Sequence, residues 1–127
     1  MRRIAMMVAL SVALLAVSAG AVLAANQQVI RCSEKPCVAT GNDDLVYERK
    51  GVGKNDRILL KGGNDKVRAD TYGADKDVIK GGAGFDVIYV TDEDTLDRIY
   101  GGKGNDKCYV NARSEVVSGC SDIIVRR

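Results

Sequence analysis

The polar and apolar residues of this 127-residue chain follow a short pattern that recurs along much of its length. An aspartate is followed, two positions later, by an apolar residue. Most of these apolar residues are β-branched, which favours short strands. They are Leu45, Ile58, Val67, Ile79, Ile88, Ile99 and Cys108. Facing inward from short strands, they would form a thin, two-sided core.

The same pattern belongs to an internal repeat with a period of about twenty residues. Three blocks align, residues 51–71, 72–91 and 92–111. Each block contains two aspartates nine residues apart, and the pairs are Asp56/Asp65, Asp77/Asp86 and Asp97/Asp106. A shorter leading half-repeat, TGNDDLVY, places Asp43 at 22 residues before Asp65 and extends the second series backwards.

The first 24 residues have a different pattern. The basic pair Arg2 and Arg3 precedes an apolar run that ends in Val22-Leu23-Ala24. This order is typical of a secretory signal peptide, with cleavage expected after Ala24. The run is also long enough for an uncleaved membrane anchor, which stays as the alternative. Lipid attachment is disfavoured, because the first cysteine, Cys32, lies well downstream. We therefore expect a secreted chain with no membrane association after cleavage.

Charge and composition narrow the chemistry of the remaining chain. Loss of the leader removes two arginines and leaves 17 basic and 17 acidic side chains, so non-specific nucleic-acid binding lacks its usual driving force. The chain contains no histidine. Serine or cysteine nucleophiles activated by histidine, and histidine-ligated zinc, are thereby excluded. An enzyme would have to use carboxylates alone.

Two segments match the nonapeptide G-G-x-G-x-D-x-U-x in its glycine and aspartate positions. They are GGAGFDVIY at residues 81–89 and GGKGNDKCY at residues 101–109. With the partial copies in register, the chain resembles the RTX, or haemolysin-type, calcium-binding β-roll family over about Thr40 to Tyr109. Ordinary turns would explain the glycine and aspartate content, but not the fixed phase of each aspartate to an apolar residue.

The resemblance implies an all-β fold, a right-handed parallel β-roll of about three to four turns. Residues 40–110 would form the repeats, between cap segments at 25–39 and 111–127. Calcium would lie between the loops of successive turns, since it accepts six to eight oxygens in irregular geometry, whereas magnesium demands strict octahedra. The implied ligands are the side chains of Asp86 and Asp106 and the carbonyls of Gly82, Gly84, Gly102 and Gly104.

The two sets of loops differ in composition. Glycine is plentiful in one set, which we expect to bind calcium; these loops precede Asp43, Asp65, Asp86 and Asp106. The other set precedes Asp56, Asp77 and Asp97, and has Lys54, Asp75 and Thr95 where the family has glycine. Turns longer than the family's either disturb this weaker set or supply its oxygens through Asp70, Asp92 and Asp94. The sequence leaves both readings open.

Two further expectations concern folding and surface charge. The apolar positions are too few to offset the ordering entropy of the repeats, so calcium binding should be coupled to folding. Outward cations stand at equivalent positions, namely Arg57, Lys66, Arg98 and Lys107. They would either hold an anionic polymer or form a solvated face, and zero net charge favours the solvated face.

Four cysteines behind a leader indicate disulfides formed in an oxidising compartment, and they allow three pairings. In a roll of three or more turns the two ends lie roughly 15 Å apart, beyond the reach of a disulfide. The expected pairs are therefore Cys32–Cys37 and Cys108–Cys120, each stapling one end as a cap. Zinc binding by Cys32 and Cys37 disagrees with their spacing and with the compartment.

These observations favour a small, secreted, monomeric calcium-binding protein that is not an enzyme. The alternative is an extracellular adhesion or matrix-binding module in which calcium is only structural and an exposed face contacts a cell-surface glycan or protein. A glycosidase with a pair of carboxylates is the remaining enzyme hypothesis. No pair stands out from the regular series, and a small roll offers little concavity for a substrate.

Overall fold

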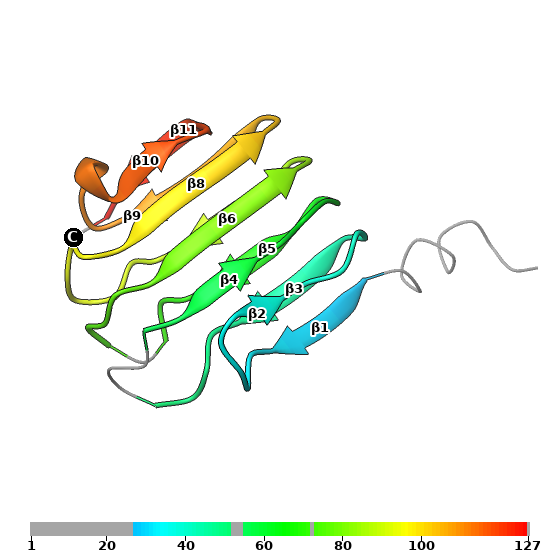
Figure 1. Cartoon of the computed structure of the whole chain (residues 1–127). Coiled ribbons are helices and arrows are strands. Elements are labelled where there is room, and N and C mark those ends of the chain that lie inside the picture. The colour runs from blue at the N-terminus through cyan, green and yellow to red at the C-terminus, as the bar shows by residue number, and fades with distance from the viewer. Residues whose placement is uncertain (1–26, 52–54, 72, 127) are drawn as a thin grey trace, which may run out of the picture.

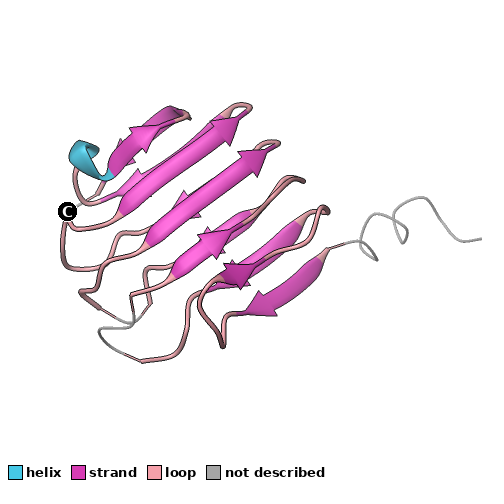
Figure 2. Ribbon diagram, in the orientation of Figure 1, coloured by secondary structure: helices cyan, strands magenta, loops and turns pink. Residues whose placement is uncertain are grey.

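The computed structural model of the chain describes residues 27–51, 55–71 and 73–126, which form an all-β fold. Eleven short strands and one 3₁₀ turn, η1 (Arg113–Glu115), make up the secondary structure of these residues (Figure 2). The predicted signal peptide, residues 1–24, lies outside them. No helix in this part of the chain has the length and apolar character to cross a membrane.

The strands form two parallel sheets. The first has the order β1 (Gln28–Arg31), β3 (Asp44–Tyr47), β5 (Lys66–Arg68), β7 (Val87–Tyr89), β9 (Asp106–Val110), β11 (Cys120–Val125). The second has the order β10 (Val116–Ser118), β8 (Arg98–Lys103), β6 (Val78–Ala83), β4 (Arg57–Leu59), β2 (Cys37–Val38). Because consecutive strands alternate between the sheets, the chain winds into a β-solenoid of about 4 turns (Figure 1). The all-β class and the parallel roll are confirmed, and the right-handed sense stays a prediction.

The inward side chains of the two sheets meet in a narrow apolar core. Ile58, Ile79 and Ile99 stand in register in the second sheet and are fully buried. The first sheet contributes an equivalent buried row, Val67, Ile88 and Cys108. Six of the seven predicted core positions are therefore confirmed. The stacking follows from the repeat, since parallel strands in constant register place equivalent residues above one another.

The inward residue of β3 is Val46, so the prediction of Leu45 as a core residue is wrong. Val46 pairs with Val67 and is fully buried, whereas Leu45 pairs with Lys66 and is partly exposed. Side chains alternate between the two faces of a strand, so a shift of one residue exchanges inside and outside. The half-repeat TGNDDLVY has two consecutive aspartates, and the strand begins at the second of them, Asp44.

A second inward row follows at the ends of the first-sheet strands and includes one carboxylate. The N–H of Ala69 donates to the carbonyl of Tyr89, and the N–H of Glu48 donates in the same way to the carbonyl of Arg68. Ala69 is buried, and Glu48 is only 4% exposed. Glu48 thus occupies a core position, beside the loop that follows β3.

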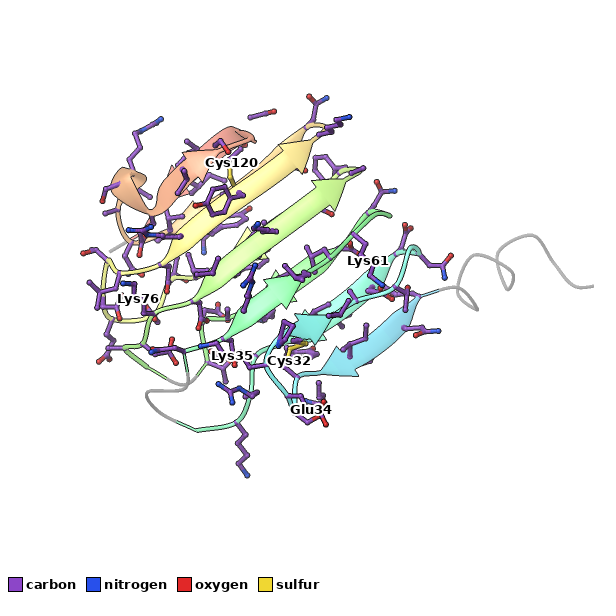
Figure 3. The ribbon with its side chains drawn as sticks, viewed as in Figure 1. Cys32, Glu34, Lys35, Lys61, Lys76 and Cys120 are labelled. Carbon is purple, nitrogen blue, oxygen red and sulfur yellow. A yellow bond between two sulfur atoms is a disulfide. The ribbon has the colours of Figure 1, made fainter. Side chains whose placement is uncertain are left out.

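Both ends of the solenoid carry a disulfide, as predicted. Cys32–Cys37 joins the end of β1 to the start of β2 with its Cα atoms 5.3 Å apart, and Cys108–Cys120 joins β9 to β11 with its Cα atoms 6.0 Å apart. Figure 3 shows Cys32 and Cys120 at opposite ends of the stack of strands. The terminal segments do not fold back over the roll, because β1, β2, β10 and β11 extend its sheets in parallel.

The predicted outward cations are divided between the two sheets. Lys66 and Lys107 belong to the first sheet, where Val87 separates them in the register. Arg57 and Arg98 belong to the second sheet, with Val78 between them. They therefore do not form one continuous ladder of positive charge.

Candidate metal centre

The loops that connect the sheets lie along two edges of the solenoid. The glycine edge consists of the loops that lead from the second sheet to the first, at residues 39–43, 60–65, 84–86, 104–105 and 119. Figure 1 shows its short loops beyond the arrowheads of β6 and β8. The acidic edge consists of the loops that lead from the first sheet to the second, with described residues 32–36, 48–51, 55–56, 69–71, 73–77, 90–97 and 111–115.

Four buried aspartates are stacked along the glycine edge, one for each turn. The backbone N–H of Asp65 donates to Oδ1 of Asp86 over 2.9 Å, and the N–H of Asp86 donates to Oδ1 of Asp106 over 2.9 Å. The N–H of Asp44 donates in the same way to Oδ1 of Asp65 over 2.7 Å. All four aspartates are buried, and the carboxylates of Asp65, Asp86 and Asp106 each hold the turn before their own.

The aspartate equivalent to Asp65 in the first turn is Asp44, and Asp43 belongs to a neighbouring exposed row. The N–H of Asn64 donates to Oδ1 of Asp43 over 2.7 Å, and the N–H of Phe85 donates to Oδ1 of Asn64 over 2.8 Å. The spacing of 21 residues from Asp44 to Asp65 equals that from Asp65 to Asp86. That equality is the signal in the sequence that identifies Asp44, and the predicted spacing of 22 missed it.

The second oxygen of each glycine-edge aspartate is the part of the site that suits a cation. Oδ2 of Asp65, Asp86 and Asp106 is buried and has no hydrogen-bond partner among the described residues. A Cβ placed on Gly81 would lie 2.5 Å from Oδ2 of Asp86 and against the carbonyl oxygen of Gly101. The absent side chain therefore leaves a cradle in which a carboxylate oxygen and a backbone carbonyl converge.

Glycine is needed at this edge for its backbone as well as for space. Gly84 and Gly104 have φ angles of 132° and 133°, which side-chain-bearing residues rarely adopt. A Cβ on either residue would collide with the carbonyl of the equivalent residue one turn earlier, Gly63 or Gly84. The loops of successive turns can therefore bring their carbonyls together only because the motif has glycine here.

The acidic edge has its own row of buried aspartates, at the positions predicted for the weaker set of loops. The N–H of Asp56 donates to Oδ1 of Asp77 over 2.6 Å, and the N–H of Asp77 donates to Oδ1 of Asp97 over 2.7 Å. Asp56 differs from the other two because Arg49 contacts both of its oxygens, through its backbone N–H and its guanidinium. An arginine therefore supplies the positive partner of Asp56.

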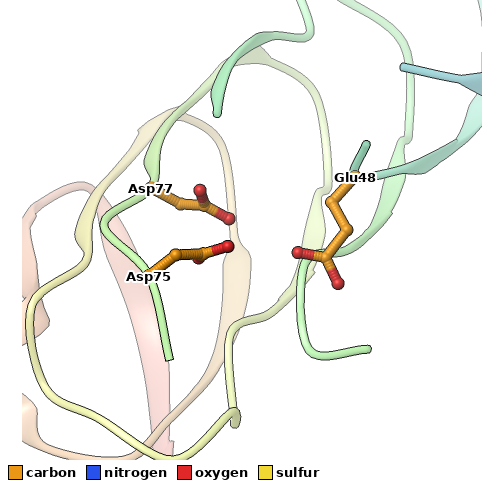
Figure 4. A group of neighbouring side chains, drawn as sticks. All are labelled: Glu48, Asp75 and Asp77. Carbon is orange, nitrogen blue, oxygen red and sulfur yellow. The ribbon is translucent and has the colours of Figure 1, made fainter. Parts of the chain in front are cut away.

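The lengthened loops of the acidic edge add further carboxylates to this row. In each of three groups, one carboxylate oxygen per residue lies within 4.8 Å of the others: Glu48/Asp75/Asp77, Asp75/Asp92/Asp97 and Asp94/Asp97/Glu115. Figure 4 shows the first group facing one gap. The sequence raised Asp92 and Asp94 as oxygen donors but missed Glu48 and Glu115, which only the fold brings here. Asp70, raised with them, pairs with Arg68 at 3.2 Å.

Burial raises the pKa of several carboxyl groups at both edges. On the acidic edge the pKa of Asp77 and of Asp97 rises to about 8, because burial and, to a smaller degree, neighbouring carboxylates disfavour the charged form. On the glycine edge the same causes raise the pKa of Asp65 to about 7 and of Asp86 to about 6. Burial also raises the pKa of Asp75, Asp92 and Glu115. A bound cation would relieve this unfavourable charge.

Stacked aspartates that face glycine loops on a parallel β-solenoid are the arrangement expected of a calcium-binding β-roll. Comparison with known families agrees: residues 71–107 and 96–112 match the RTX calcium-binding nonapeptide repeat, in 4 copies. Residues 71–112 therefore match RTX repeats, and calcium is the ion for which repeats of this family are named. No curated protein and no solved structure was found to match the chain.

Proposed function

We propose that this protein is a small secreted calcium-binding β-roll whose ions lie between successive loops of the glycine edge. The observation that carries the proposal is the second carboxylate oxygen of Asp65, Asp86 and Asp106, which is buried beside glycine loops and has no hydrogen-bond partner in the described part of the chain. The predicted carbonyl ligands belong to those loops and are Gly82, Gly84, Gly102 and Gly104. Of the other predicted ligands, Asp43 stays a weaker candidate than Asp44, and Asp56 is already paired with Arg49.

Calcium suits this donor set better than magnesium. The edge offers one carboxylate for each turn together with several backbone carbonyls, all of them hard oxygen donors from a semi-regular stack. Calcium accepts six to eight such oxygens at flexible angles, whereas magnesium demands six in an octahedron and gives up its water reluctantly. The chemistry that calcium would supply is charge neutralisation, which allows consecutive aspartates to lie one above another.

Calcium binding is proposed to be coupled to folding. The core is one or two side chains deep in each turn, and the stacked aspartates disfavour the folded chain as long as they stay ionised and unneutralised. An ion that bridges two turns binds only when both turns are in place. The free energy of binding therefore becomes free energy of folding.

The proposed location is outside the cell. The two disulfides support it, because disulfides persist in oxidising compartments. Cleavage of the leader after Ala24 and a monomeric state remain part of the proposal. Strands β1 and β11 end the first sheet, and the neighbouring disulfides tie down the chain at both ends.

A calcium titration of the disulfide-intact protein after chelation tests the function. We expect calorimetry to report more than one bound ion and far-UV circular dichroism to gain β signal, with little response to magnesium. The double variant Asp86→Asn/Asp106→Asn should lose ions, whereas Asp122→Asn, an exposed carboxylate outside both edges, should bind as the parent does. Full binding by the double variant would sink the assignment to the glycine edge.

A second candidate function is adhesion, with calcium only as scaffold. The rings of Tyr89 and Tyr109 are stacked 4.4 Å apart on the outer face of the first sheet, and the guanidinium groups of Arg68 and Arg126 lie over them at 5.5 Å and 4.6 Å. Flat aromatic rings flanked by cations suit an acidic glycan or protein. If this function holds, Tyr109→Ser abolishes binding to an acidic polysaccharide and leaves calcium affinity unchanged.

A further inference from the structure

We propose that the acidic edge is a second cation-binding site, chemically distinct from the glycine edge and built from carboxylates that lie mostly outside the repeat motif. The three carboxylate groups share members, since Asp75 belongs to the first and second groups and Asp97 to the second and third. They therefore form one row across successive turns, the acidic row: Glu48, Asp77, Asp75, Asp92, Asp97, Asp94 and Glu115. The ligand class is a hard divalent cation such as calcium.

Asp75 gives the strongest indication that this row is made for a ligand. Its side chain is buried, with 6% of the residue exposed, and neither of its carboxylate oxygens accepts a hydrogen bond from an N–H or hydroxyl group in the described chain, while the carboxyl group of Asp77 lies close enough to share a proton with it. Figure 4 shows its carboxylate directed at the gap that it shares with Asp77 and Glu48. A buried ionised carboxylate without donors is strongly unfavourable unless a positive partner is bound.

Two further members of the row, Glu115 and Asp97, each leave one oxygen for a ligand while the other oxygen is held in place. Glu115 is fully buried, and its Oε2 accepts the N–H groups of Asn111 at 2.8 Å and Ala112 at 2.9 Å, while Oε1 has no partner within the described ranges. Asp97 is held through Oδ1 by the N–H of Asp77, and its Oδ2 is likewise without a partner. Backbone bonds thus orient the row in advance.

No basic side chain of the described residues neutralises the members on which the argument rests. The ion pairs of the described residues are Arg49–Asp56, Arg68–Asp70 and Lys107–Asp122. None of these pairs includes Asp75, Asp92, Asp97 or Glu115. Asp56 precedes Asp77 in the same stack, and its charge is neutralised by Arg49 instead of by a bound cation. The four members of the acidic row named above lie in the turns after Asp56, where no such arginine is paired with them among the described residues.

The two edges should therefore bind cations with different selectivity. A gap of the acidic row presents three carboxylates, whereas a gap of the glycine edge presents aspartate oxygens together with neutral carbonyls. Affinity for a cation rises with the number of charged ligands. We expect the acidic row to contain the tighter class of calcium sites and to favour trivalent lanthanum over calcium more strongly than the glycine edge does.

Variants in the row test the proposal, with calcium as the probe and native mass spectrometry as the ion count. Asp75→Asn should remove at least one ion that Asp86→Asn/Asp106→Asn retains, and should weaken the tighter class more than tenfold. Without calcium, the same variant should melt at a higher temperature than the parent, because it removes a buried unpaired charge. Addition of calcium should raise the melting temperature of this variant less than it raises that of the parent.

The outcomes separate this site from the glycine-edge function. An unchanged ion count in Asp75→Asn overturns the acidic row and leaves the glycine edge untouched. An equal rise in melting temperature with and without calcium overturns it too, because the charge would then be merely structural. Should Asp75→Asn fold poorly, Glu115→Gln tests the proposal by the same ion count and melting temperatures. Glu115 belongs only to the group Asp94/Asp97/Glu115, so this variant leaves the other two groups intact.

Discussion

The glycine edge and the acidic edge carry the same stacked aspartates but surround them with different oxygens. On the glycine edge, Gly84 stands two residues before Asp86 and its missing side chain exposes backbone carbonyls. On the acidic edge, Asp75 stands two residues before Asp77 and adds a carboxylate instead. A cation gap can therefore be built either by removing side chains or by adding charged ones.

The two edges also differ in the lengths of their loops. From an acidic-edge aspartate to the next glycine-edge aspartate is nine residues in every block, but from Asp65 to Asp77 is twelve and from Asp86 to Asp97 eleven. The strands stay in register throughout. All extra residues are thus accommodated by the acidic edge, where they carry Asp92 and Asp94 into the row.

Calcium removal should have the largest effect, because it acts on both edges. At a calcium concentration a hundred times Kd, each ion contributes about 2.7 kcal/mol, which corresponds to a change of about 10 °C or more in Tm for a domain of this size. We expect chelation to lower Tm by at least that amount for each ion lost, as measured by calorimetry. A Tm that does not respond to chelation would mean that core and disulfides suffice.

A side chain on the glycine edge should have the next largest effect. Gly104→Ala places a Cβ against the carbonyl of Gly84 at a φ of 133°, so we expect a loss of about 2–4 kcal/mol and a weaker calcium response. Gly41→Ala is the matched control, since no described residue other than its two chain neighbours has an atom within 4 Å of the added Cβ. Urea unfolding of both variants measures the difference. Equal stabilities would contradict the close approach of successive loops.

The pH dependence of the calcium-free protein should reveal the buried carboxyls. Asp77 and Asp97 have a pKa of about 8 in the folded chain, against 3.8 without the fold. Between about pH 4 and pH 8 the folded chain therefore binds more protons, and its stability falls as pH rises. We expect unfolding at pH 5 to require at least about 1.4 kcal/mol more than at pH 8.

Calcium provides the control for this titration. Protons compete with the ion for the same oxygens, so in calcium the trend should flatten or reverse. A chelated protein that becomes more stable from pH 5 to pH 8 would show that the stacked carboxyls are not buried as described.

The smallest effect should distinguish the two consecutive aspartates of the first turn. Asp44→Asn removes a buried charge from the glycine-edge stack, where Oδ2 accepts the N–H and the hydroxyl of Thr40, and should cost about 1 kcal/mol in calcium. Asp43→Asn keeps the acceptor for Asn64 at an exposed position and should change stability little. Calorimetry of the two variants in calcium measures the difference in their stabilities. A larger effect at Asp43 would mean that Asp43, 22 residues before Asp65, is the member of the stack as the sequence predicted.

Much of the fold followed from the repeat. Isoleucines at a constant distance from aspartate predicted the inward rows, and the separation of the ends in a roll predicted both disulfides. Leu45 failed because the first half-repeat contains two aspartates, and a local pattern does not decide between them. The pairing with Lys66 and Val67 does, since it fixes which face of β3 is inside.

The amino-acid sequence by itself determined the repeat, the aspartate stacks, the glycine loops and hence the β-roll, because these depend on spacing that is regular along the chain. Tertiary structure alone added Glu48 and Glu115 to the acidic row. These two residues belong to no repeat motif and lie far apart in sequence, and each joins a group of aspartates only because stacking brings every loop of one edge to the same side of the solenoid. Periodic features can be read from a sequence, whereas a contact between irregular loops depends on the fold that places them together.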